Sequence, residues 1–456
     1  MKFVDELPLN DDSNSHQFSG WGRLDVHARR VRTIYMEPLR IVISPNIYLR
    51  ISAMRDSPLL PGLKNLYIPD NSSFDLSSAL FLASGSTLNM VQLGGDAISE
   101  REFFVPFLSS LYIKSPGLSH LALREPILCA SVEPIYRFTK LQSLEIWLGG
   151  AYLHPHLLHK LGQLPHLLDL IISTEDIEIS IQPHTNPISI SNSKFRQLRH
   201  LQLFGFPASI SCILSELKGL TNLNTLEIHD VSDGRTGTAN SVWKSSFEVI
   251  STFSAVEDIK IFHVQDRPKR AHYIHSAHSL APLFRLDNLK SFIIDFNMGF
   301  SGSDDDFRLI AGGFPKLKKF VIPKPSPFLG GFGGVRTLAC LYYLSRGCPD
   351  LREIKIALSF DSNISDNLNA IKDLPRPIVR NHHHPLKKLY IDTNFGQLKP
   401  IQLVQVARFL DHIFPNLSTL ETNNKKLTEA ANWTGIHELR LALQDARINS
   451  SSASGF

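Results

Sequence analysis

The chain has 456 residues, of which 43% are hydrophobic and 20% are charged. This composition is typical of a folded protein and excludes an intrinsically disordered one. The formal net charge of +4 is small for this length, and no long basic block is present, which argues against a nucleic-acid partner. No apolar run reaches the roughly 18 residues that a membrane-spanning helix needs, which argues against a membrane protein.

Four widely spaced cysteines, with no CxxC pair, indicate reduced thiols and not a disulfide framework. They are Cys129, Cys212, Cys340 and Cys348. The first 20 residues are acidic and polar, unlike a secretory signal peptide. We therefore predict a cytoplasmic or nuclear protein that is not secreted.

The chain begins with a polar segment, residues 1–20, which we expect to be disordered. The apolar spacing from Trp21 to Arg30 then fits a short helix. From Val31 onward, a hexapeptide with apolar residues at positions 1, 4 and 6 recurs fourteen times; its clearest copy runs from Leu351 to Ile356. The fourteen copies begin at Val31, Leu63, Leu88, Leu118, Leu141, Leu167, Leu198, Leu223, Val256, Leu289, Leu317, Leu351, Leu386 and Leu417.

Successive copies are about 30 residues apart on average, at the upper end of the leucine-rich-repeat period. This length leaves room for a helix after each strand. We therefore predict an α/β leucine-rich-repeat solenoid, or horseshoe, of about 14 repeats over residues 21–429. Its parallel β-sheet would form the concave face, and its helices would form the convex face. The buried apolar positions would close the core without metal or disulfide, and we expect no cofactor.

The segments between the hexapeptides support this alternation of strand and helix. Ser303 precedes three aspartates and then an apolar pattern, which predicts an N-capped helix that Gly312 and Gly313 end. Residues 335–344 and 401–414 also have helical spacing. Residues 177–191 alternate apolar and polar residues around a Pro-Asn turn, which predicts a β-hairpin, and residues 361–384 are irregular. Residues 430–447 predict a C-terminal capping helix, followed by a disordered tail, residues 448–456.

The amino-acid sequence in and around the repeats resembles the leucine-rich-repeat region of fungal F-box proteins of the basidiomycete type. The matching segments are RLDVHARRVRTIYM, SPLLPGLKNL, LSSLYIKSPGLSHLAL, FTKLQSLEI, LGQLPHLLDLII and FPNLSTLET. The resemblance implies the substrate-recognition subunit of a Skp-cullin-F-box ubiquitin ligase, whose repeats bind a target protein. Its partners would be that target, a Skp-type adaptor and a cullin. The F-box itself is not recognisable, so a repeat-only binding protein without a ligase is the alternative.

A binding surface is predicted from the alternation of side chains along a strand. If positions 4 and 6 of a repeat point into the core, positions 3, 5 and 7 point to the concave face. Position 7 carries large aromatic residues at Trp147, Phe204 and Phe262, and such residues are enriched at protein-binding sites. We predict a protein- or peptide-binding face centred on these three. Its other members are Glu145, Asp169, His200, His229, Lys260, Lys355 and Tyr390. The alternative is that the bulky residues pack beneath neighbouring loops.

Three histidine clusters, at residues 154–159, 272–278 and 382–384, invite a metal-binding interpretation. None lies near a cysteine or has the ligand spacing of a zinc site, so we interpret them as surface histidines. The glycine-rich segment 329–334 lacks the complete phosphate-binding motif and is interpreted as a flexible turn. No local pattern supports catalysis, and we predict a protein that is not an enzyme.

Overall fold

The structure is a computed structural model that describes most of the repeat array. The described residues are 19–35, 47, 50–51, 54, 58–68, 82, 87–95, 101–149, 155–174, 195–231, 239–264, 274–275, 277–294, 299–300, 302–322, 336–358, 384–392, 398–422 and 427–453. The chain forms two compact units. Unit 1 comprises residues 1–149 and 164–167, and unit 2 comprises residues 150–163 and 168–456.

Unit 1 contains a parallel sheet whose strands pair in chain order. Its strands are β1 (Thr33–Tyr35), β2 (Asn65–Ile68), β3 (Met90–Leu93), β4 (His120–Ile127) and β5 (Ser143–Leu148). Its helices are α1 (Ser19–Ala28), α5 (Arg101–Lys114) and the 3₁₀ helix η1 (Cys129–Arg137). The predicted helix at Trp21 is therefore present as α1.

Unit 2 continues the same alternation of parallel strands and helices. Its main strands are β6 (Asp169–Thr174), β7 (His200–Gly205), β8 (Thr225–Asp230), β9 (Asp258–His263), β11 (Ser291–Ile294), β13 (Lys319–Val321), β14 (Glu353–Ala357), β15 (Lys388–Asp392) and β16 (Thr419–Glu421). The pairs that join them are parallel and follow chain order. A separate two-stranded sheet pairs β10 (Ile274–His275) with β12 (Gly299–Phe300).

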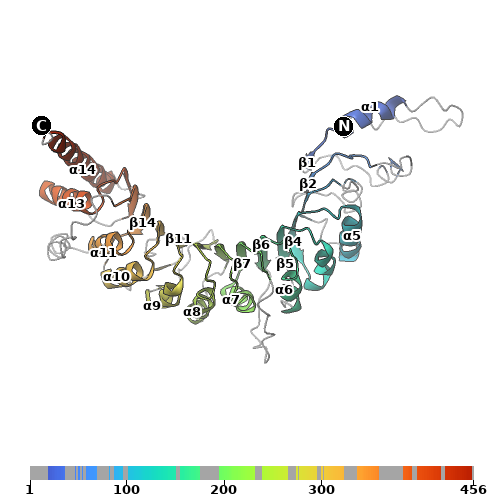
Figure 1. Ribbon diagram of the computed structural model, residues 1–456, viewed down its shortest axis with the longest axis horizontal. Helices are drawn as coiled ribbons and strands as arrows, with labels where there is room; N and C mark the ends of the chain where they lie inside the picture. Colours follow the sequence, from blue (N-terminus) through green and yellow to red (C-terminus); the bar gives the residue numbers. More distant parts are fainter. Residues whose placement is uncertain are drawn as a thin grey trace. The chain divides into compact units, whose positions relative to one another are not determined.

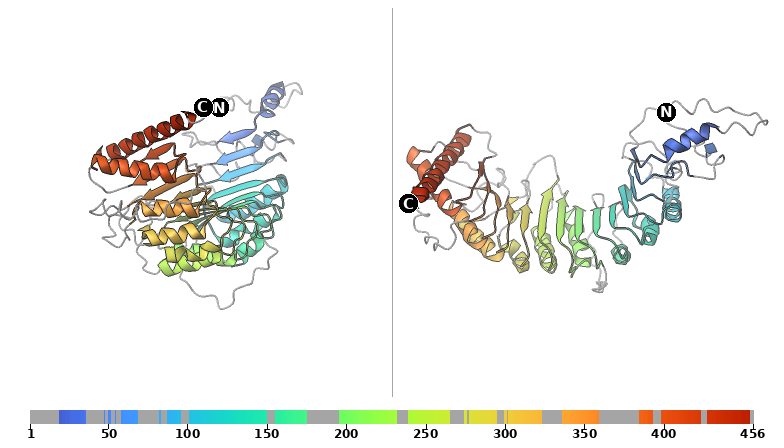
Figure 2. Two further views of the ribbon diagram at one scale, coloured as in Figure 1. Left: turned by 60° about the vertical axis from the view of Figure 1, so that its left-hand side comes forward. Right: turned by 45° about the horizontal axis from the view of Figure 1, so that its top comes forward.

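The helices of unit 2 stack along one face of its sheet, one behind the next (Figures 1 and 2). They are α6 (Pro155–Leu161), α7 (Pro207–Glu216), α8 (Ala239–Ile250), α9 (Ala277–Leu280), the 3₁₀ helix η2 (Ala281–Arg285), α10 (Asp304–Gly313), α11 (Ala339–Gly347), α13 (Pro400–Ile413) and α14 (Leu427–Ala453). The other face of the sheet, here called the helix-free face, corresponds to the predicted concave face.

Each of the fourteen predicted hexapeptides contains a strand of the described structure. From the second to the thirteenth repeat, the residues at positions 1, 4 and 6 are at most 2% exposed. Burying one such side chain stabilises the fold by about 1.5–3 kcal/mol, before the cost of chain entropy. Positions 3, 5 and 7 remain partly exposed in strands such as β5 and β8. The α/β leucine-rich-repeat fold is thereby confirmed.

Asparagine side chains link consecutive repeats at three of the turns that precede a strand. Asn288 lies directly before the first leucine of its repeat, and its Nδ2 donates to the carbonyl of Ser254 at 3.3 Å. Asn416 occupies the same position and donates to the carbonyl of His384 at 3.2 Å. Asn222 donates likewise to the carbonyl of Arg196. These bonds satisfy turn carbonyls that no strand or helix partner reaches.

The helix predicted after Ser303 is confirmed as α10. Ser303 is its N-cap, and the Asp306 carboxylate accepts a hydrogen bond from the Ser303 backbone N–H at 2.7 Å. The helix expected over 335–344 instead spans Ala339–Gly347. Leu338 is its N-cap, and the Thr337 hydroxyl just before it accepts the backbone N–H of Ala339 at 3.0 Å.

The C-terminal helix α14 packs against α13 and β16. It buries Trp433 and Ile436, two of the residues expected on its apolar face. It continues to Ala453, so residues 448–453 belong to this helix and not to a disordered tail. The expected hairpin at 177–191, the glycine-rich segment 329–334 and the polar lead before Ser19 lie outside the described residues.

Candidate functional site

Strands β7, β8 and β9 align their outward-facing residues in rows across the helix-free face of unit 2. The strands pair in register without a bulge. Position 7 of the three repeats therefore places Phe204, His229 and Phe262 side by side. Position 5 places Gln202, Glu227 and Lys260 in the adjacent row. The sheet brings together residues that are separated by about 30 positions in the chain.

The first row is an aromatic stack. The rings of Phe204 and His229 have centroids 4.1 Å apart and an interplanar angle of 13°. The rings of His229 and Phe262 have centroids 5.0 Å apart and an angle of 29°. All three side chains are half-buried, so each ring leaves part of its surface accessible to solvent. The spacing of neighbouring strands imposes this arrangement, because equivalent residues lie about 4.8 Å apart.

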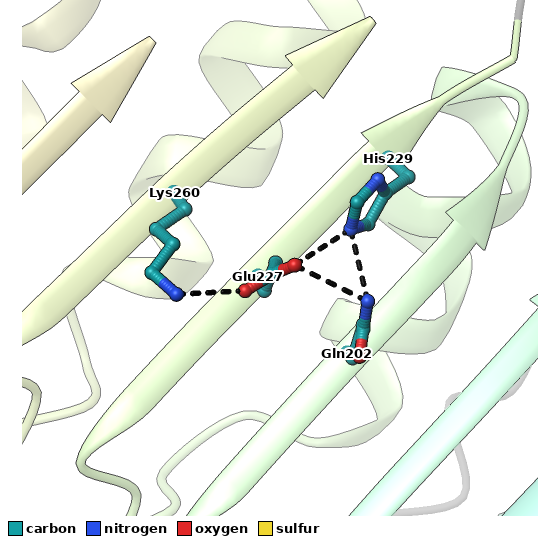
Figure 3. Close-up of polar contacts among 4 residues, drawn as sticks. All are labelled: Gln202, Glu227, His229 and Lys260. Atoms are coloured by element: carbon teal, nitrogen blue, oxygen red, sulfur yellow. Dashed lines mark hydrogen bonds and ion pairs between the residues drawn. The ribbon is translucent and has the colours of Figure 1, made fainter. Parts of the chain in front are cut away.

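The second row is a polar network centred on Glu227 (Figure 3). Its Oε2 accepts a hydrogen bond from Nζ of Lys260 at 3.0 Å. Its Oε1 lies 2.8 Å from Nε2 of His229 and 3.2 Å from Nε2 of Gln202. Glu227 thus holds the polar edge of the His229 ring while both ring faces contact phenylalanine. The network fixes the orientation of the imidazole within the stack.

The surroundings of Glu227 favour its ionised form. Burial raises the pKa of this carboxyl group. The hydrogen bonds and positive charge that Lys260 and His229 supply act in the opposite direction and outweigh burial. The pKa of Glu227 therefore lies below its usual value, and the carboxylate is charged at neutral pH.

Asp169 and His200 form a more exposed pair at the start of β6 and β7. Asp169 Oδ1 lies 2.5 Å from Nδ1 of His200. Their side chains are 40% and 57% exposed, respectively. An exposed pair of this kind contributes little to stability. It lies at the other end of β7 from Phe204, with the polar row between it and the aromatic stack, and it forms a polar margin such as protein-binding surfaces commonly have.

Trp147 and Glu145 belong to a separate cluster in unit 1. Arg124 binds the Glu145 carboxylate with two parallel hydrogen bonds, from Nε at 2.8 Å and from an NH2 group at 3.0 Å. The indole Nε1 of Trp147 donates to the same carboxylate at 3.2 Å. The indole is half-buried and held in place by its polar edge. The bidentate geometry is the strong form of an arginine–carboxylate contact.

Lys355 and Tyr390 lie next to each other in the paired strands β14 and β15. Within the sheet order of unit 2, β11 and β13 separate these strands from β9. The ten predicted residues therefore form three groups. The structure brings together Asp169, His200, Phe204, His229, Lys260 and Phe262, and it places Glu145 with Trp147 and Lys355 with Tyr390.

Three residues of these groups were not among the ten predicted. Gln202 and Glu227 are position 5 of the repeats that begin at Leu198 and Leu223, and Arg124 is position 7 of the repeat that begins at Leu118. The same positional rule that selected Phe204 identifies all three. They were not selected because the prediction started from large aromatic residues, and these side chains are polar.

The predicted surface histidines include one that is not at the surface. His384 is 8% exposed, its Nε2 lies 3.3 Å from the carbonyl oxygen of Cys348, and its ring meets Phe414 edge to face. Burial lowers the pKa of His384 and outweighs the effects of the Cys348 carbonyl and Asp350. His275 lies in β10. Within the described residues, no group of three His, Cys, Asp or Glu side chains could hold a metal ion.

Comparisons with known proteins identify no close relative. No family model matches the chain, and no curated protein matches it. Among solved structures, an internalin from Listeria monocytogenes shares 13% identity over 83% of this chain and 94% of its own, with a TM-score of 0.40. A Rad7–Elc1 complex from yeast shares 14% identity over 64% of this chain and 78% of its own, with a TM-score of 0.33. A leucine-rich-repeat-containing protein from Legionella pneumophila shares 13% identity over 89% and 95%, with a TM-score of 0.33.

These TM-scores are all below 0.5, and the likenesses bear on neither the partners nor the activity of this chain. No helix among the described residues is both long and apolar enough to cross a membrane. The functional argument therefore depends on the helix-free face itself.

Proposed function

We propose that the chain is a protein-interaction scaffold that binds a segment of a target protein on the helix-free face of unit 2. The observation that carries the proposal is the half-buried stack of Phe204, His229 and Phe262. Aromatic side chains provide large contact areas, and they lose few rotatable degrees of freedom on binding. A stack that is already ordered in the free protein lowers the entropic cost of binding further.

The polar row supports the same function through its internal pairing. Glu227 is occupied by Lys260, His229 and Gln202, so the network needs no partner atom to satisfy it. A partner therefore gains from contact with the aromatic stack without breaking the partly exposed ion pair of Glu227 and Lys260. The more exposed Asp169 and His200 would supply polar contacts at the margin. This combination suits a peptide or protein surface better than a small charged ligand.

The alternative, in which the aromatic residues pack beneath neighbouring loops, makes a different prediction. Substitution of Phe204 and Phe262 by alanine would then lower the free energy of unfolding and leave partner binding unchanged. Under our proposal, the double variant F204A/F262A loses the partner and keeps its fold. The matched control is Y343A, because Tyr343 is a half-buried aromatic residue on α11, at the helix side of the sheet.

The decisive experiment is quantitative affinity capture with the full chain, followed by a binding titration of the captured protein. A protein bound by the wild type and by Y343A, but lost from F204A/F262A, supports the proposal when urea unfolding shows all three chains to be folded. Equal capture by all three chains contradicts it. Photo-crosslinking from position 262 then identifies the segment that contacts the stack.

Within this class, we propose the substrate-recognition subunit of a Skp-cullin-F-box ubiquitin ligase as the specific role. The support is the resemblance of the repeat segments to those of fungal F-box proteins. The target would occupy the helix-free face, and a Skp-type adaptor and a cullin would bind elsewhere, in the cytoplasm or nucleus. The runner-up is a repeat-only binding protein. Co-purification of the chain with a Skp-type adaptor at equal stoichiometry separates the two, since the repeat-only protein recruits no adaptor.

A further inference from the structure

A second surface with a distinct chemistry lies on the helix side of unit 2, between α8 and the α9–η2 segment. The sequence builds one wall from α8 and the turn after it, where Lys244, Glu248 and Thr252 are spaced by four residues. The other wall comes from His278, Ala281 and Arg285, spaced by three and four residues. On α8, the spacing of four places Lys244 and Glu248 on one face of the helix. The two helices are neighbours in unit 2 (Figure 1).

The space between the two walls is a groove of about 650 Å³. Its apolar lining comes from Val249, Ala281 and Pro282. Lys218 joins the lining from the loop that follows α7. The volume of the groove lies within the range of about 300–1,000 Å³ that is typical of ligand-binding pockets.

Among the described residues, the charges of the groove are not balanced. Three of the described lining residues, Lys218, Lys244 and Arg285, carry cationic side chains, while Glu248 is the one acidic side chain among them. All three cationic residues are exposed, and none of their side chains makes a hydrogen bond or an ion pair with another described residue. On the helix-free face, by contrast, Lys260 and Lys319 are each paired with a glutamate.

We propose that this groove binds an acidic peptide segment of a partner protein. Carboxylates of the segment would pair with Lys218, Lys244 and Arg285, and its small apolar side chains would cover Val249 and Pro282. Nucleic acid fits less well, because the lining includes Glu248 and apolar residues in place of a continuous cationic track. The surface is independent of the aromatic stack, so it extends the proposed function to a second partner site.

The test measures fluorescence anisotropy of a fluorescein-labelled peptide of alternating Glu and Val, titrated with the full chain at low salt. The groove variant is K244E/R285E, and the matched control is K140E/R408E. Lys140 and Arg408 are exposed, are not among the residues that line the groove, and give the same change in net charge. We expect the groove variant to raise the Kd at least about tenfold, because each reversal exchanges an attractive contact for a repulsive one. The control should change it less than about twofold.

Equal losses in the groove variant and the control would show nonspecific charge attraction and overturn the proposal. It would also be overturned if the wild-type chain bound the peptide without saturation, or if an oligo-dT strand competed at equal charge concentration. The neutral variant K244Q/R285Q should give an intermediate Kd, which guards against misfolding in the reversal variant. Retained peptide binding by F204A/F262A would show that the groove acts independently of the aromatic stack. This result holds whether or not the aromatic stack binds a target protein.

Discussion

The imidazole ring of His229 lies flat against the ring of Phe204, with 4.1 Å between centroids and 13° between planes. The two residues are 25 positions apart in the chain and are neighbours because β7 and β8 pair in register. His229 is also in contact with Phe262 on its other side. The histidine therefore joins two phenylalanines into one surface, and its removal would divide that surface.

This relationship predicts the effect of two substitutions at His229 on target binding. H229F keeps a ring between Phe204 and Phe262, so we expect the Kd of the target to stay within about threefold of the wild type. H229A removes the ring and should raise the Kd about tenfold, since a stacked pair is worth about 0.5–1.5 kcal/mol. Isothermal titration of the captured target measures both. Equal weakening by the two variants would indicate that the hydrogen bond to Glu227, and not the ring, matters.

Glu227 predicts a stability change in acid. Its pKa is lowered in the folded chain because Lys260 and His229 together outweigh the effect of burial, so the folded state binds fewer protons than the unfolded state just below pH 4.5. The stabilisation it contributes is complete above that pH and is lost as the pH falls through the folded pKa. Urea unfolding of the wild type and E227Q should therefore differ most at neutral pH and converge in acid. A difference that stays constant with pH would contradict the assigned shift.

Asp304 predicts a pH dependence of stability that is opposite to that of Glu227. Burial raises its pKa and outweighs the hydrogen bonds that it accepts from Thr337, whose backbone N–H and hydroxyl lie 2.8 and 2.6 Å away. The folded chain therefore binds more protons than the unfolded chain above pH 3.8, and the stability due to Asp304 falls as the pH rises through its folded pKa. We expect D304N, which keeps an acceptor for Thr337, to gain stability relative to the wild type between pH 3.5 and neutrality, measured by urea unfolding.

The sequence was sufficient for the strands because each repeat has the same buried positions. Leu351, Ile354 and Ile356 were assigned to the core from spacing alone, and they are at most 1% exposed. Register followed from the same rule, so the neighbours Phe204, His229 and Phe262 were predictable as a row. The contacts of Glu227 with Lys260, His229 and Gln202 at the same time were not predictable, because only side-chain geometry shows which neighbours one carboxylate reaches.

Helix boundaries were predicted less well than strands. The helix expected from residue 335 begins at Ala339, and Arg336 before it is buried over the ring of Phe300, 5.3 Å from its centroid. Burial lowers the pKa of Arg336 to about 10. In the helical pattern of the sequence, this arginine occupies a polar position. Periodicity assigns such residues to the surface because it carries no information on contacts between distant repeats.

Two glycines in neighbouring helices provide a matched test of how closely α10 and α11 pack. A Cβ atom at Gly347 would lie 2.5 Å from the carbonyl oxygen of Ala311, so the helices would have to move apart. A Cβ atom at Gly312 would meet no atom within 4 Å. We expect G347A to lower the free energy of unfolding by about 1–3 kcal/mol through overpacking. G312A should raise it by about 0.5–1 kcal/mol, because alanine favours the helix. Urea unfolding at neutral pH measures both changes. Equal stabilisation by the two substitutions would show that α11 does not contact α10 at Gly347.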